Sequence, residues 1–117
     1  MNWLSRRIKS FGHAFNGVGV LLQEPHARLH LLATFVVLGL GGWLGLSRGD
    51  WQALILTVAA VWLAEGLNTA LEYLCDAVVP EQHPLIGKAK DVAAAAVLIT
   101  ALFAVVMAGL IFLPYLL

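Results

Sequence analysis

Charged residues and cysteines are scarce in this chain of 117 residues. Asp, Glu, Lys and Arg make up 12% of it, about half the share expected of a soluble domain, whereas 61% of the residues are hydrophobic. The single cysteine, Cys75, excludes a disulfide framework and a paired-cysteine metal site. A soluble domain of this size could not bury so many apolar side chains. The formal net charge is zero, so the information lies in where the charges are placed.

The apolar residues form three runs that are long enough to cross a bilayer. We expect membrane helices at residues 26–46, 51–79 and 92–115, with a polar turn at 47–50 and a polar loop at 80–91. Residues 1–22 instead alternate apolar and basic side chains at helical spacing, with glycines that allow bends. This pattern predicts an amphipathic helix in the membrane interface. The predicted fold is therefore an all-α integral membrane domain covering residues 1–117.

Lysine and arginine are unevenly distributed between the two ends of these helices. The cytosolic side is predicted from two basic segments, which carry Arg6, Arg7, Lys9 and Arg28 before the first span and Lys88 and Lys90 in the 80–91 loop. The 47–50 turn has only Arg48. The positive-inside rule thus places the N-terminus and the 80–91 loop in the cytosol.

A stripe of polar residues runs along the second half of the second predicted helix. Asn68, Glu72 and Asp76 follow Glu65 at offsets of three, seven and eleven, which on an α-helix fall within an arc of roughly 80°. A single charge at the centre of a membrane helix costs on the order of 2.5–3.5 kcal/mol on insertion scales. A chain that keeps three acids on one face of such a helix is expected to use them.

These residue types suit phosphoryl transfer to a membrane lipid. Mg²⁺ takes one or two carboxylates together with phosphate oxygens, and Glu24 and Glu72 are predicted to lie near the cytosolic ends of neighbouring helices. Lys90 and Arg6 could neutralise phosphate charge. Glu65, the deepest acid, could act as the base for a hydroxyl at membrane level. The chain has neither a P-loop nor the protein-kinase motifs, which excludes a soluble kinase fold.

Residues 65–91 also carry a resemblance to a known family. They contain the patterns E-x-x-N-[ST]-A-[IL]-E-x-x-x-D and E-x-H-x-L-x-G-[KR]-A-K-D without a gap. In this respect the chain resembles the bacterial diacylglycerol kinase/undecaprenol kinase family of small integral membrane lipid kinases. The segment Glu24 to His30 and the three-span layout agree with it. His30, two residues after Arg28, resembles the undecaprenol-kinase branch more than the enteric diacylglycerol kinases.

The resemblance implies roles for particular residues. Glu65 would be the catalytic base, and Glu24 and Glu72 would hold the Mg²⁺ of Mg-ATP. The implied nucleotide-binding residues are Arg6, His13, Glu24, Asn68, Glu72, Asp76, Glu81, Gln82, His83, Lys90 and Asp91. The implied lipid-substrate residues are Arg6, Glu65 and Ala94. The resemblance further implies a homotrimer in the bacterial inner membrane, with active sites near subunit interfaces and no nucleic-acid partner.

Two other classes of function remain open on the residues alone. Glu65 could carry a proton in a small transporter, which would not need the 80–91 loop or ATP. His26 and His30, four residues apart, could instead hold a metal or haem in a non-catalytic anchor subunit. Local hydrogen bonding of these two histidines in the interface is the plainer interpretation.

Overall fold

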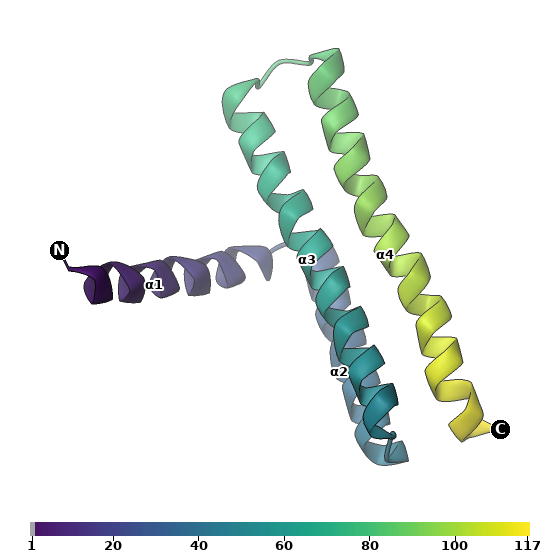
Figure 1. Ribbon diagram of the computed structural model, residues 1–117. Coiled ribbons are helices and arrows are strands. Elements are labelled where there is room, and N and C mark those ends of the chain that lie inside the picture. Colours follow the sequence, from purple (N-terminus) through teal and green to yellow (C-terminus); the bar gives the residue numbers. More distant parts are fainter. Residues whose placement is uncertain (1) are drawn as a thin grey trace.

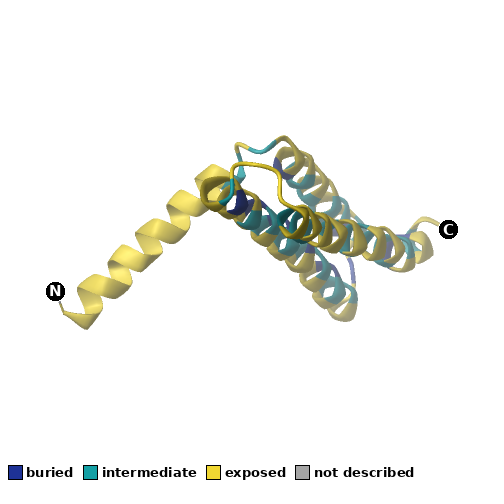
Figure 2. Ribbon diagram, turned by 90° about the horizontal axis from the view of Figure 1, so that it is seen from above, coloured by how far each residue is buried: buried dark blue, intermediate teal, exposed yellow. Residues whose placement is uncertain are grey.

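The computed structural model describes residues 2–117, and these form four α-helices (Figure 1). The helices are α1 (Trp3–Leu21), α2 (Pro25–Leu44), α3 (Arg48–Val78) and α4 (Pro84–Leu116). α3 and α4 run antiparallel side by side, and α2 packs along the N-terminal half of α3. α1 projects sideways from the bundle at the start of α2 (Figures 1 and 2). The prediction of an all-α chain is confirmed.

Three of these helices are long and apolar enough to cross a membrane, namely α2, α3 and α4. With 20, 31 and 33 residues, they are ~30, ~46 and ~50 Å long at 1.5 Å per residue. α2 therefore matches the ~30 Å hydrocarbon core of a bilayer, whereas α3 and α4 exceed it. The excess length of α3 and α4 leaves room for a polar site at one end of the bundle.

Local sequence explains where α2 and α3 begin and end. Pro25 occupies the first turn of α2, where its missing N–H costs no hydrogen bond. Gly45 ends α2 with a φ of 68°, a left-handed conformation that favours glycine. The Ser47 side chain then caps α3 by accepting a hydrogen bond from the Asp50 N–H.

One prediction about the connecting segments is wrong. The polar loop expected at 80–91 is confined to residues 79–83, because α4 already begins at Pro84. Pro84 is pre-organised for a first helical turn, and Nδ1 of His83 accepts the Leu85 N–H as a cap. α1 is one continuous helix from Trp3 to Leu21, so the bends that its glycines allow are not used.

The tightest packing lies where the α2–α3 turn meets the C-terminal end of α4. Leu46, Leu54, Ile111 and Phe112 form a buried apolar cluster there. The hydroxyl of Tyr115 donates to Asp50 Oδ2 at 2.7 Å and accepts the Ser47 N–H at 2.9 Å. This end of the bundle is therefore held together by apolar packing and by two hydrogen bonds of Tyr115.

Most large apolar side chains of the four helices remain exposed within the single chain. In α1 they include Trp3, Ile8 and Phe15, each at least 64% exposed. Figure 2 draws α1 as exposed from its start up to its last turn. Exposed apolar surface of this extent is expected of helices that face lipid or a second subunit.

Candidate active site

The acidic stripe lies on the outer half of α3 and differs in burial along its length. Glu65 is only 3% exposed, whereas Glu72 and Asp76 are open to solvent. Glu72 and Asp76 lie ~10 and ~16 Å further along the helix axis than Glu65. Seventeen helical residues precede Glu65 in α3, which places it ~25 Å from the start of that helix. Glu65 therefore lies near the boundary of a hydrocarbon core that begins at the α2–α3 turn.

The buried carboxylate of Glu65 meets a histidine from the neighbouring helix. Oε2 of Glu65 lies 3.3 Å from Nε2 of His30, whose side chain is 19% exposed. The His30 ring packs edge-on against Trp62, with centroids 6.3 Å apart. The Trp62 indole N–H donates to Thr34 Oγ1 at 2.9 Å, and this hydroxyl donates to the His30 carbonyl at 2.7 Å. Three side chains, His30, Thr34 and Trp62, thus join α2 to α3 around Glu65.

Glu24 and Glu72 are each held by a partner on α3. The Tyr73 hydroxyl donates to Glu24 Oε1 at 3.0 Å, which fastens the start of α2 to the turn of α3 that contains Glu72. The Asn68 amide donates to Glu72 Oε1 at 3.5 Å. The contact between Tyr73 and Glu24 places the start of α2 beside the turn of α3 that also carries Glu72.

The residues at this level fit a magnesium ion that arrives with its nucleotide. Within residues 2–117 no group of three or more His, Cys, Asp or Glu side chains could hold a metal unaided. Mg²⁺ is usually held by one or two carboxylates and by substrate phosphates, so a complete protein cage is not required. The Asn68 Oδ1 atom is buried and is the one buried side-chain oxygen of the described residues that lacks a hydrogen-bond partner. Two carboxylates and one orphaned amide oxygen form a suitable donor set.

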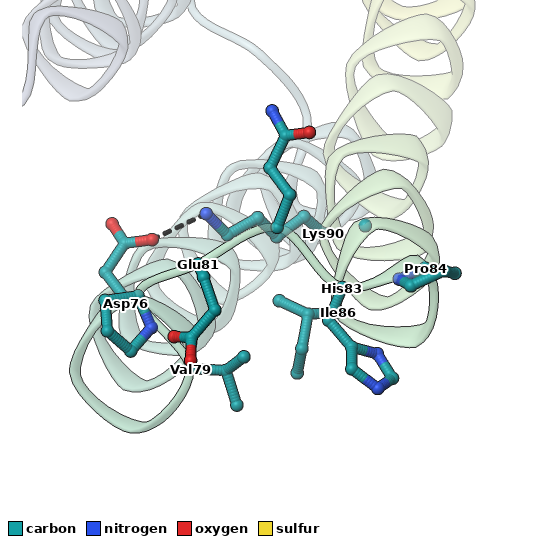
Figure 3. A pocket seen from close by; sticks show the side chains of 10 residues that line it. Asp76, Val79, Glu81, His83, Pro84, Ile86 and Lys90 are labelled. Atoms are coloured by element: carbon teal, nitrogen blue, oxygen red, sulfur yellow. Dashed lines mark hydrogen bonds and ion pairs between the residues drawn. The ribbon is translucent and has the colours of Figure 1, made fainter.

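A hollow of about 570 Å³ lies beyond Glu72, between the ends of α3 and α4. Five of the residues predicted to bind nucleotide line it, namely Asp76, Glu81, Gln82, His83 and Lys90. The Lys90 ammonium reaches across from α4 to Asp76 Oδ1 at 2.6 Å, as drawn in Figure 3. The structure therefore brings together a cation, two carboxylates and polar groups from the end of α3, the 79–83 connection and the start of α4.

Other predicted residues lie outside this arrangement. Arg6 and His13 are exposed on α1, which leads away from the bundle (Figure 2). Asp91 and Ala94 are exposed on α4, and neither lines the hollow. Within one chain, Asn68 is bound to Glu72, Glu24 is bound to the neighbouring Tyr73, and the residues of the hollow form a separate group. Glu65 lies deeper than both.

Sequence reasoning missed two residues of the site, His30 and Tyr73. The sequence indicates His30 as a local hydrogen-bonding residue, as a cofactor ligand together with the exposed His26, or as a mark of the undecaprenol-kinase branch, but not as a partner of Glu65. No sequence pattern indicates Tyr73. Each contacts an acid on another helix, and spacing within a single helix does not indicate such a pair. The one available signal was the unusual presence of a histidine in an apolar run.

Fold and site together define a small helical protein with three candidate membrane spans and a carboxylate-rich site at one end of them. Comparison with known proteins assigns the family. Residues 12–112 match the family described as prokaryotic diacylglycerol kinase, and the chain belongs to this family of lipid kinases.

Three relatives each cover most of the chain. The undecaprenol kinase of Bacillus subtilis (strain 168) is 37% identical over 114 residues, which are 97% of this chain and 93% of that protein. The diacylglycerol kinase of Escherichia coli (strain K12) is 33% identical over 103 residues, covering 87% and 84% of the two chains. A diacylglycerol kinase of Synechocystis is 37% identical over 112 residues, 94% of this chain and 64% of that protein. The resemblance noted in the sequence is therefore confirmed.

Proposed function

We propose that this protein transfers the γ-phosphate of Mg-ATP to the hydroxyl group of a membrane lipid. The observation that carries the proposal is the buried carboxylate of Glu65 on α3, which lies deeper in the bundle than Glu24, Glu72 and the polar hollow. Membership of a lipid kinase family favours this reaction over a proton-coupled transporter and over a cofactor-bearing anchor subunit.

The nucleotide would extend along the outer half of α3. In this arrangement the hollow beside Asp76 and Lys90 takes one end of ATP, and the phosphates descend toward Glu72 and Asn68. Glu24, Glu72 and the free Asn68 oxygen would hold Mg²⁺, which when bound neutralises charge on the phosphate oxygens. Lys90 can leave Asp76 for a phosphate at little cost, because both side chains of that pair are partly exposed.

Glu65 then acts on the acceptor. Its carboxylate takes the proton of the lipid hydroxyl while the hydroxyl oxygen forms a bond to the γ-phosphorus. At the same time the bond between the γ-phosphorus and the oxygen that bridges it to the β-phosphate breaks. ADP leaves, and the proton is released from Glu65 in a later step. A base at this depth meets only hydroxyl groups held at membrane level, so water, which is abundant further out, is a poor competitor.

The acceptor is proposed to be undecaprenol, with diacylglycerol as the second candidate. His30 supports this order, because the segment from Arg28 to His30 resembles the undecaprenol-kinase branch. The Bacillus subtilis relative, which bears that name, aligns over 97% of this chain. Both acceptors present a hydroxyl at the membrane surface on a long apolar body, so either one can reach Glu65.

We further propose an inner-membrane homotrimer with the N-terminus and the 79–83 connection in the cytosol. The placement of basic residues supports the orientation. α1 would lie in the membrane interface, with exposed residues such as Trp3 and Phe15 in lipid. Because α1 leads away from its own bundle, Arg6 and His13 can serve a nucleotide or lipid phosphate only in a neighbouring subunit's site. Ala94, exposed on α4, is available to acceptor lipid or to a neighbour.

Radiolabelled ATP tests the proposed reaction directly. Purified protein in detergent or lipid is supplied with Mg-ATP and with undecaprenol, diacylglycerol or a lipid lacking a free hydroxyl. Labelled undecaprenyl phosphate or phosphatidic acid is expected, and no labelled product from the third lipid. Wild-type protein that labels none of them would refute the proposal.

Two matched variants separate the proposed base from the proposed magnesium ligand. Glu65→Gln should lower kcat by roughly 100-fold to 10,000-fold, the range of general-base catalysis, while ATP still binds. Glu72→Gln should instead weaken Mg-ATP binding, measured by equilibrium dialysis. Both substitutions remove one charge and keep the side-chain shape, so each serves as the control for the other. Full lipid phosphorylation by Glu65→Gln would exclude Glu65 as the base.

A further inference from the structure

The carboxylate of Glu65 is oriented from one side only. His30 Nε2 lies 3.3 Å from Oε2, and among residues 2–117 no other side chain forms a hydrogen bond or ion pair with this carboxylate. Oε1 is left free. While the carboxylate is ionised, Nε2 must carry a hydrogen, because two lone pairs facing each other at this distance would repel.

The imidazole of His30 is itself fixed. Trp62 packs edge-on against the ring, and the indole N–H of Trp62 is bound to Thr34, one turn further along α2 than His30. The Thr34 hydroxyl in turn donates to the His30 carbonyl oxygen. Rotation of the His30 ring would require Trp62 to move, and this would break its hydrogen bond to Thr34. The ring therefore presents Nε2 to Glu65 in one orientation.

The surroundings strengthen the contact between His30 and Glu65. His30 also borders an apolar groove of about 320 Å³ between α2, α3 and α4, whose lining includes Ala33, Val61 and Ala104. Apolar walls exclude water from this side of the pair and lower the local dielectric constant, which increases the attraction between an N–H dipole or cation and a carboxylate.

We propose that His30 is the positioning residue of Glu65. Its Nε2–H holds Oε2, so that Oε1 faces the hydroxyl of the lipid acceptor in the orientation needed for proton transfer. His30 touches neither the nucleotide residues nor the phosphorus, so its contribution falls on kcat. This inference rests on the proposed lipid kinase activity and extends it to a residue on α2 outside the acidic stripe.

Substitutions at position 30 test the role. His30→Leu removes the donor and should lower kcat on the order of 100-fold, the effect of misplacing a reacting group by ~1 Å, while the KM for ATP changes less than about twofold. His30→Gln keeps an N–H at similar reach and should recover at least about a tenth of the wild-type kcat. His26→Leu, one turn earlier on the same helix and exposed, is the matched control and should retain full activity.

A second pair covers the case in which His30→Leu does not fold. His30→Gln and His30→Asn are both polar amides that differ by one methylene, and only the longer reaches Oε2. His30→Gln is therefore expected to exceed His30→Asn in kcat at equal ATP KM. Equal kcat values for this pair, or full kcat in His30→Leu, would overturn the assignment. Wild-type protein without any lipid product would instead refute the proposed function, so the two failures are distinguishable.

Discussion

Removal of the Tyr73 hydroxyl offers a sharp test of the proposed magnesium site. The hydroxyl donates a hydrogen bond to Glu24 Oε1 at 3.0 Å. Among the described residues, this is the only hydrogen bond from α3 to the Glu24 side chain. Tyr73→Phe leaves the ring in place and frees the Glu24 carboxylate to rotate away from α3. Partners that orient a metal ligand typically contribute roughly 10-fold to 100-fold in metal affinity.

The expected magnitude lies at the lower end of that range because Tyr73 is 52% exposed and water can replace part of the hydrogen bond. We expect the Mg-ATP KM to rise about 10-fold in Tyr73→Phe, with kcat lowered less than about threefold. Initial rates of lipid phosphorylation across a magnesium titration at fixed free ATP measure both quantities. Magnesium well above its new KM should bring the rate back to within about threefold of the wild-type rate.

Tyr115→Phe provides the matched control at the opposite end of the bundle. It deletes another hydroxyl that donates to a carboxylate, Asp50 Oδ2, far from the proposed metal site. This variant should lower the Tm of the detergent-solubilised protein without changing the magnesium dependence. An unchanged magnesium KM in Tyr73→Phe, or the same shift in both variants, would show that Tyr73 does not orient a metal ligand.

Two further predictions concern packing and the hollow. In Gly41→Ala the new Cβ would lie 2.9 Å from Leu46 Cδ1 and 3.0 Å from a ring carbon of Trp51. This overpacking should destabilise the α2–α3 corner by ~1–3 kcal/mol. A Tm equal to that of the wild type would contradict this prediction. Lys90→Ala should raise the KM for ATP by about tenfold, because a phosphate loses its charged donor. The Tm of this variant should change little, because Lys90 and its partner Asp76 are partly exposed. An unchanged KM for ATP would show that Lys90 does not bind the nucleotide.

Much of the fold could be predicted from local pattern. Length and composition predict three membrane helices, and the structure has candidate spans within a few residues of the predicted ones, apart from the start of α4. Polarity alone predicts a loop at 80–91, but the chain is helical from Pro84 onward. Lys88, Ala89 and Lys90 are good helix formers, and Pro84 with the His83 cap supplies a helix start, so the polar segment continues the helix beyond the apolar run.

The candidate site divides in the same way. The stripe of Glu65, Asn68, Glu72 and Asp76 could be read from spacing because residues three and four apart share one face of a helix. Tyr73, five positions short of the end of α3, lies off that stripe and contacts Glu24 only because the start of α2 is placed against it. The roles assigned to these residues remain predictions.

The sequence by itself determined the number and order of the helices and the face of α3 that carries acids, because hydropathy and helical periodicity act within a single segment. Only the tertiary structure decided which partners those acids have: His30 for Glu65, Tyr73 for Glu24 and Lys90 for Asp76. Such pairs depend on the relative rotation and offset of two helices. These are set by side-chain packing across the whole bundle, as at the cluster of Leu54 and Phe112.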